Sequence, residues 1–180
     1  MLTKNKKDLP YVSVVGNIFE QASSRISHGI NGCNVIIPHV CNNVNGFGAG
    51  FANDVTHYYP IVKDNFHLLG KKAILGYVQF VTVKEDPVYK YKLIFANMIA
   101  QNGIINSKNQ RPLNYPALVK CMMTVRQHGL DIMNNNENTK VEIHAHKFGS
   151  GLAGGNWYFI TDLIEDIWSN NFNVHIYTKK

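Results

Sequence analysis

The fold of this chain is decided by the stretch Phe148-Gly149-Ser150-Gly151-Leu152-Ala153-Gly154-Gly155-Asn156-Trp157. Residues 141–146, directly before it, alternate apolar and polar side chains, which predicts a strand. Residues 160–168, after it, carry apolar side chains at helical spacing. A glycine-rich turn between a strand and a helix lets the backbone approach a ligand closely and directs unpaired N–H groups toward it. Such a turn favours phosphate or carboxylate, and for one isolated loop the alternative is a tight turn that simply needs glycines.

A second stretch of the same kind removes much of that ambiguity. It is Asn42-Asn43-Val44-Asn45-Gly46-Phe47-Gly48-Ala49-Gly50, which follows the apolar run 34–41 and precedes a helical pattern over 50–59. Two loops suited to anions in one small domain predict a phosphorylated ligand.

Composition and charge narrow the class of protein. The chain has 180 residues, of which 45% are hydrophobic and 17% charged, and this balance is typical of one globular domain with a sizeable core. The net charge is +6, but five lysines lie at the two ends, namely Lys4, Lys6, Lys7, Lys179 and Lys180. The body therefore lacks the dense basic stripe of a dedicated nucleic-acid binder, and we expect no specific nucleic-acid partner.

Cysteine and histidine spacing predicts neither disulfides nor a metal centre. The cysteines are Cys33, Cys41 and Cys121, without Cys-x-x-Cys spacing, and they are expected to be reduced and mostly buried. His144 and His146 lie two apart on one strand, with no third ligand at metal spacing, so we expect no zinc site and no cofactor. No apolar run has the length of a membrane span, and a cytoplasmic protein without a membrane partner is expected.

The order of elements predicts the layers of the fold. We expect a loose arm over 1–10 and a single domain over 11–180, with a loop or poor helix over 19–33 and a strand end or bulge at Pro38. Strands are predicted at 11–15, 34–41, 73–83, 91–99, 141–146 and 173–178, and helices at 50–59, 114–133 and 160–168, with Pro60 ending the first. Strands alternating with helices, plus one hairpin over 73–99, predict an α/β fold with three α/β/α layers and a mixed central sheet.

These loops and their surroundings resemble the macro domain family, in particular its small stand-alone branch related to proteins that process ADP-ribose-1″-phosphate. The resemblance runs from Val14 to Tyr177. Four pieces carry it: the turn 15–18, the first ligand loop over 39–52, the segment 97–101 followed by Arg111 and Tyr115, and the second ligand loop over 149–157. Four motifs in the family's order are far more specific than any one glycine motif.

The resemblance implies a single macro domain with ADP-ribose between the two loops. Adenine would lie against Ile18 and Tyr177 with Asn17 reading its amino group, the diphosphate between the loops, and the terminal ribose near Asn42. The expected ligand-binding residues are Asn17, Ile18, Phe47, Gly48, Ala49, Gly50, Gly149, Ser150, Gly151, Leu152, Ala153, Gly154, Asn156 and Tyr177. The expected catalytic residues are Asn42, which would position water, and His57, which would transfer a proton.

Several positions depart from the family's pattern. Asn17 and Asn156 stand where relatives usually carry aspartate, and His146-Lys147 stands where many carry proline. The lysine and aspartate of the branch that removes ADP-ribose from glutamate are not evident. The leading hypothesis is therefore a phosphatase for ADP-ribose-1″-phosphate. The alternatives are a binding protein that sequesters ADP-ribose-type nucleotides without turnover and, from another class, an RNA-binding protein.

Overall fold

The computed structural model describes residues 9–135 and 139–179, so residues 1–8 of the expected N-terminal arm lie outside it. A mixed six-stranded sheet forms the middle layer, with the strand order β1-β6-β5-β2-β4-β3. Only β3 runs antiparallel to its neighbour, β4. The strands are β1 (Val12–Val15), β2 (Asn34–Asn42), β3 (Val78–Glu85), β4 (Lys92–Gln101), β5 (Val141–His146) and β6 (Asn173–Thr178). The helices are α1 (Ile18–Ile26), α2 (Phe51–Tyr58), α3 (Pro60–His67), α4 (Tyr115–Asn135) and α5 (Trp157–Ile167).

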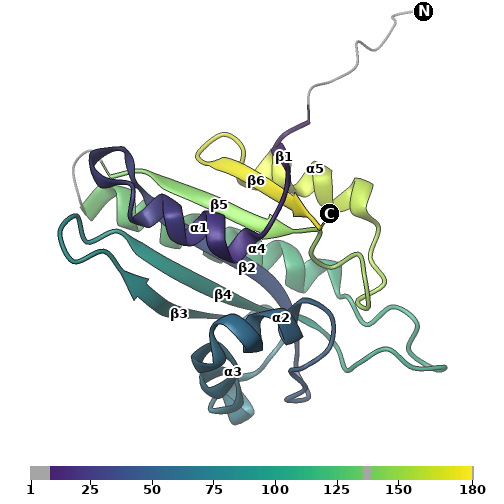
Figure 1. Cartoon of the computed structure of the whole chain (residues 1–180). Coiled ribbons are helices and arrows are strands. Elements are labelled where there is room, and N and C mark those ends of the chain that lie inside the picture. The colour runs from purple at the N-terminus through teal and green to yellow at the C-terminus, as the bar shows by residue number, and fades with distance from the viewer. Residues whose placement is uncertain (1–8, 136–138, 180) are drawn as a thin grey trace, which may run out of the picture.

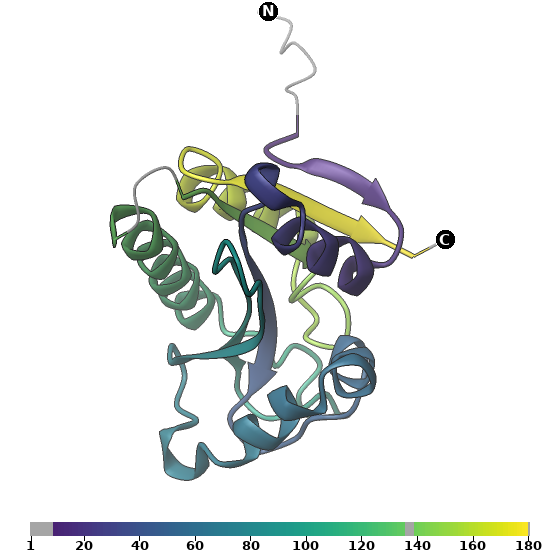
Figure 2. The ribbon, with the colours of Figure 1, turned by 60° about the vertical axis from the view of Figure 1, so that its left-hand side comes forward.

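The helices cover both faces of the sheet, which confirms the expected three-layer α/β/α architecture (Figures 1 and 2). The alternation of side chains along the central strands creates the two cores. Val35 and Ile37 of β2 pack with α1, α2 and α3, whereas Ile36 between them packs with α4 and α5. Because both faces are covered, β2 and β4 are buried almost throughout, as the apolar run 34–41 predicts.

Helix α1 occupies residues for which we expected either a loop or a poor helix, and the loop alternative was wrong for residues 19–26. Asn17 begins the helix as its N-cap, with Oδ1 accepting hydrogen bonds from the backbone N–H groups of Phe19 and Glu20. The buried side chains are Ile18, Phe19, Ala22 and Ile26, which lie on one face at a helical period. Polar residues between them mask this pattern, yet the cap and the stripe together specify a helix.

One of two prolines acts differently from our expectation. Pro38 marks neither a strand end nor a bulge, because it lies inside β2 opposite Ala96, and the irregularity falls between Cys41 and Asn42. The ladder of β2 with β5 ends at Ile36, so the missing N–H of Pro38 is tolerated where β2 has a partner on one side only. Pro60 ends α2 as predicted and also begins α3, where its missing N–H would have no helical partner.

The described residues agree with the expected cysteine chemistry. Cys33, Cys41 and Cys121 are buried and unpaired. Within residues 9–135 and 139–179, none of the helices combines the length and the apolar character that crossing a membrane requires.

Candidate functional site

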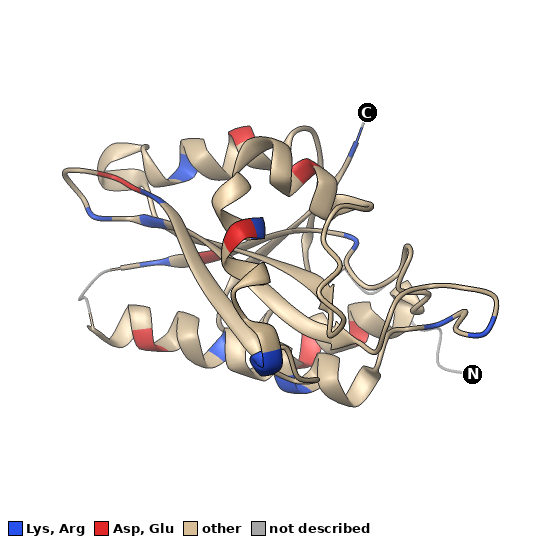
Figure 3. Ribbon diagram, turned by 90° about the horizontal axis from the view of Figure 1, so that it is seen from below, with Lys and Arg blue, Asp and Glu red and all other residues tan. Residues whose placement is uncertain are grey.

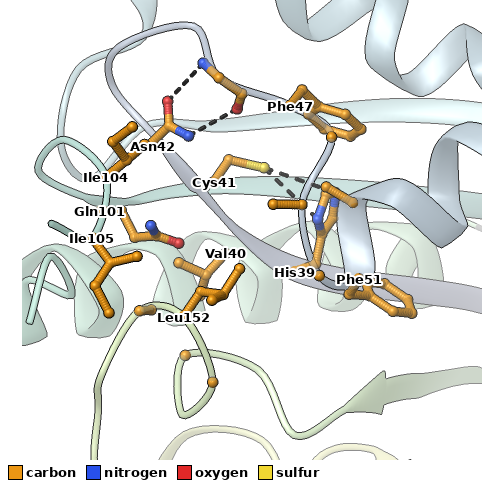
Figure 4. A pocket seen from close by; sticks show the side chains of 18 of the residues that line it. His39, Val40, Cys41, Asn42, Phe47, Phe51, Gln101, Ile104, Ile105 and Leu152 are labelled. Atoms are coloured by element: carbon orange, nitrogen blue, oxygen red, sulfur yellow. Dashed lines mark hydrogen bonds between the residues drawn. The ribbon is translucent and has the colours of Figure 1, made fainter.

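A cleft with a volume of about 860 Å³ lies where β2, β4 and β5 end. The two glycine-rich loops form its walls, and Figure 4 shows Leu152 of the second loop opposite Asn42 and Phe47 of the first. In open α/β sheets, ligands bind beyond the carboxyl ends of parallel strands, because loops and helix starts converge there. The cleft occupies that position.

Asn42 holds the first loop in shape. Its Oδ1 accepts from the backbone N–H groups of Val44 and Gly46, and its Nδ2 donates to the Gly46 carbonyl at 2.8 Å (Figure 4). Both acceptor positions of the amide oxygen are thereby used, and one amide hydrogen remains available. Asn42 is therefore a loop-forming residue with a single spare donor toward the cleft.

Backbone N–H groups line both sides of the cleft without partners. In the described part of the chain, those of Gly48, Ala49 and Gly50 donate no hydrogen bond, and the same holds for Gly151, Leu152 and Ala153. Gly50 has a φ of 58° at the N-terminus of α2, a conformation that suits glycine. Six unpaired donors on two facing loops suit the oxygens of a phosphate or diphosphate.

The glycines at the centres of the loops leave space in the cleft. A Cβ added to Gly48 or to Gly151 would meet no atom within 4 Å, and neither residue has a positive φ. Both positions would therefore accept a side chain without backbone strain, and that side chain would enter the cleft. Gly154 differs, because its φ is 72° and a Cβ there would lie 2.7 Å from the Gln110 carbonyl. Its role is to close the turn.

Two histidines and Phe51 form the floor of the cleft. The ring of His146 stacks on Phe51 at 3.9 Å, and His39 contacts the same ring at 5.8 Å. His39 is buried and hydrogen-bonded through Nε2 to Oδ1 of Asn97 at 2.6 Å; because Asn97 donates its own amide hydrogen to Gln79, the proton of His39 sits on Nε2. His39 is therefore a buried histidine whose Nε2 has a hydrogen-bond partner.

Burial keeps both histidines neutral. It lowers the pKa of His39 to about 4, although the hydrogen bond with Asn97 opposes this. It lowers the pKa of His146 to about 3, with His39 and Lys179 adding to the effect, and Nδ1 of His146 is buried without a hydrogen-bond partner among the described residues. The floor is therefore uncharged at neutral pH and supplies no imidazolium for acid catalysis.

The cleft carries little charge. Among the described residues that line it, Lys147 has the one charged side chain, and none is a carboxylate. Elsewhere lysines, arginines and acids alternate over the molecule, and the view in Figure 3 shows no continuous basic stripe. A cleft lined by unpaired N–H groups and one lysine, without carboxylates among its described lining residues, accepts an anion without like-charge repulsion.

The structure brings nine of the expected ligand-site and catalytic residues into the cleft and leaves seven outside its lining. Those in the cleft are Asn42, Phe47, Gly48, Ala49, Gly50, Gly149, Gly151, Leu152 and Ala153. Those outside are Asn17, Ile18, His57, Ser150, Gly154, Asn156 and Tyr177.

The residues outside the lining make structural contacts of their own. Asn17 and Asn156 cap α1 and α5, and the Asn17 amide also donates to the Tyr58 hydroxyl at 2.7 Å. Ser150 donates to the Lys147 carbonyl. Ile18 and Tyr177 lie in the core under α1. His57 is an exposed residue of α2 whose ring contacts Tyr58, and the structure gives it no position from which to act in the cleft.

Sequence reasoning missed part of the lining. Gln101 lies opposite Asn42 at the end of β4, and its side-chain amide makes no hydrogen bond within the described chain. Ile104 and Ile105, both exposed, form an apolar rim beside it (Figure 4). The available signal was the position of Gln101 at the end of a parallel strand adjacent to β2.

Comparison with solved structures identifies the fold. A macrodomain protein from Streptomyces coelicolor matches with a TM-score of 0.62 and 26% identity, over 81% of this chain and 88% of that one. This chain has the macrodomain fold. A protein of unknown function from Bacteroides thetaiotaomicron shares 26% identity at a TM-score of 0.73, over 97% of this chain and 100% of that one.

A further macrodomain match is the DarTG protein of Thermosipho africanus in complex with ADP-ribose. It has a TM-score of 0.64 and 16% identity, over 94% of this chain and 42% of that one. No family model matches the sequence, and no curated protein matches it.

Proposed function

We propose that this macrodomain binds ADP-ribose or a close derivative in the cleft between its two glycine-rich loops. The observation that carries the proposal is the set of six backbone N–H groups without partners in the described chain, on two loops that line one cleft without carboxylates. A diphosphate supplies acceptor oxygens for donors on both sides, and Lys147 adds a compatible charge. The ADP-ribose complex of the Thermosipho DarTG protein, which shares the fold, supports the same ligand.

The rest of the ligand follows from the position of the diphosphate. The terminal ribose lies toward Asn42 and Gln101, whose amides offer donors and an acceptor to its hydroxyl groups. The adenine extends toward the N-terminus of α1, where Asn17 and Tyr58 are hydrogen-bonded to each other. In this placement the adenine lies beyond the cleft lining, near Asn17, whereas Ile18 and Tyr177 are buried in the core beneath it.

Calorimetry with ADP-ribose tests the proposal. The expected result is one-to-one binding of ADP-ribose. AMP should bind more weakly, because it fills only part of the cleft between the two glycine-rich loops. Absence of ADP-ribose binding, or equal affinity for AMP, contradicts a site built around the diphosphate. Binding of single-stranded RNA alone would support the RNA-binding alternative instead.

The second candidate function is hydrolysis of ADP-ribose-1″-phosphate. The spare amide hydrogen of Asn42 favours it, because this donor lies at the ribose end, where it would orient a water molecule or the phosphate. Neither His39 nor His146 is an imidazolium acid at neutral pH, so positioning and electrostatic stabilisation would supply the catalysis. Release of inorganic phosphate distinguishes this activity from binding alone.

Asn42→Ala is expected to lower phosphate release about a hundredfold, because an orienting hydrogen bond that strengthens in the transition state is lost. Affinity for ADP-ribose is expected to fall by a smaller factor, roughly fivefold, because loosening the loop removes net hydrogen-bond energy on the order of 1 kcal/mol. The measurements are phosphate release from ADP-ribose-1″-phosphate and calorimetry with ADP-ribose.

His57→Ala is the matched control and should retain full activity, since His57 is exposed outside the cleft. Loss of activity in this variant would contradict the present assignment and restore His57 as a proton-transfer group. Tight ADP-ribose binding by the wild type without any phosphate release would identify a sequestering protein.

A further inference from the structure

Away from the cleft, three metal-binding side chains converge between the sheet and α1. Glu142 and His144 are alternate residues of β5, so they point to the same face, and His175 of β6 is directly paired with His144. The carboxylate Oε2 of Glu142 lies 2.9 Å from Nε2 of His144 and 3.8 Å from Nε2 of His175. These three donor atoms all lie within 4.8 Å of one another.

The separations suit a tetrahedral ion. Bonds of about 2.0–2.2 Å from zinc to nitrogen and oxygen place neighbouring ligand atoms roughly 3.4 Å apart, and the two measured separations bracket that value. The Nε2 atom of His175 is buried and has no hydrogen-bond partner within the described residues. A buried nitrogen without a partner is costly unless something occupies its lone pair or its proton, and an ion at this point would do so.

Contacts around the three donors would hold them in place for an ion. Nδ1 of His144 lies 2.8 Å from the Tyr177 hydroxyl, which in turn lies 3.5 Å from Oε1 of Gln21. With an ion on Nε2, the His144 proton moves to Nδ1 and is donated to Tyr177, whose hydroxyl donates onward to Gln21. Metal-bound histidines commonly make such a second hydrogen bond, which fixes the ring and its tautomer.

We infer that Glu142, His144 and His175 form a binding site for a zinc ion. Two imidazoles and one carboxylate suit zinc better than magnesium or calcium, which prefer oxygen ligands throughout. The fourth position is left for water, and the partly exposed His175 side chain, 23% accessible, marks the route of entry. The sequence alone offered no third ligand near His144, because His175 comes from a strand about thirty residues further along the chain.

Arg25 sets the expected strength of binding. Its guanidinium donates to both carboxylate oxygens of Glu142, with Nη2 to Oε1 at 2.6 Å and Nε to Oε2 at 3.0 Å. This bidentate contact orients the carboxylate, but its positive charge opposes a nearby cation. The zinc affinity is therefore expected to be moderate and to increase when the charge of Arg25 is removed.

The test is calorimetric titration of the chelator-treated full chain with zinc chloride, together with the absorption spectrum of the cobalt-substituted protein. The expected result is one zinc ion per chain and the intense visible bands of tetrahedral cobalt. His175→Ala should weaken zinc binding at least a hundredfold and remove the cobalt bands. His28→Ala, at an exposed histidine outside the cluster, should change neither.

Arg25→Gln provides an independent variant and should bind zinc more tightly than the wild type, with an unchanged circular dichroism spectrum. Absence of stoichiometric zinc binding by the wild type, or wild-type affinity in His175→Ala, would overturn the site. Wild-type zinc affinity in a folded Glu142→Gln variant would remove Glu142 as a ligand and overturn it equally.

Discussion

Gly151→Glu is expected to abolish ADP-ribose binding, with affinity falling more than a hundredfold, while the protein remains folded. Gly151 lines the cleft, has no positive φ and has open space where a Cβ would be built. The glutamate side chain would occupy the space proposed for the diphosphate and place a like charge against it. In a partly buried site, that repulsion amounts to several kcal/mol. Calorimetry with ADP-ribose measures the loss, and circular dichroism checks the fold.

Two further substitutions at the same position separate size from charge. Gly151→Ala adds one methyl group in open space and should keep affinity within a few-fold of the wild type. Gly151→Gln has the size of glutamate without its charge and should lie between the alanine and glutamate variants. Wild-type affinity in a folded Gly151→Glu variant would remove the second loop from the ligand site.

Mild acid is expected to destabilise the fold through the floor of the cleft. The pKa values of His39 and His146 are lowered to about 4 and about 3, against 6.5 for an unperturbed histidine. Below pH 6.5 the unfolded chain takes up protons that the folded protein does not, so stability falls as the pH falls. Each histidine contributes up to about 1.4 kcal/mol per pH unit, or up to about 2 kcal/mol between pH 6.5 and pH 5.

Urea unfolding at a series of pH values from 7.5 to 5 measures this dependence, and His146→Gln isolates one histidine. Glutamine does not titrate in this range, so the variant should lose stability less steeply than the wild type, by close to one proton. His28→Ala, which removes an exposed histidine, should keep the wild-type slope. Equal slopes for the wild type and His146→Gln would show that His146 is protonated in the folded state and is not held neutral by burial.

The fold was predictable wherever one segment carried a complete local signal. The apolar run of β2, the hairpin of β3 and β4 and the capped helix α4 are local patterns, and the structure confirms them. Pro38 was misread because its tolerance depends on how far β5 pairs with β2, which no local pattern contains. Helix α1 was predicted only as one of two alternatives because tertiary burial of Ile18, Phe19 and Ala22 outweighs the weak helix propensity of its serines.

The candidate site, too, was predictable where the signal lies in consecutive residues and not where it depends on strand pairing. The glycine loops were recognisable because their chemistry is contained in consecutive residues. Gln101 and His146 were missed as cleft residues because only the parallel alignment of β4, β2 and β5 brings them together. Asn42 lies in the cleft lining, and its hydrogen bonds to Val44 and Gly46 show that most of its hydrogen-bonding capacity holds the loop itself.

The pairing of β1 with β6 has a consequence for the order of events during biosynthesis. Among the residues that the structure describes, Val12 to Val15 pair only with His175 to Thr178, and the Gly16 amide donates to the carbonyl of Thr178. A nascent chain therefore leaves the ribosome with β1 unpaired until about 160 further residues have been translated. Because the Val12 and Val15 side chains are exposed, we expect this unpaired strand to bind chaperones or neighbouring nascent chains. Joining residue 179 to residue 9 requires a linker of about a dozen residues or more, because it must run back along the parallel pair. With the chain opened within residues 106–110, such a circular permutant would have β1 next after β6 in the sequence and should avoid the delay.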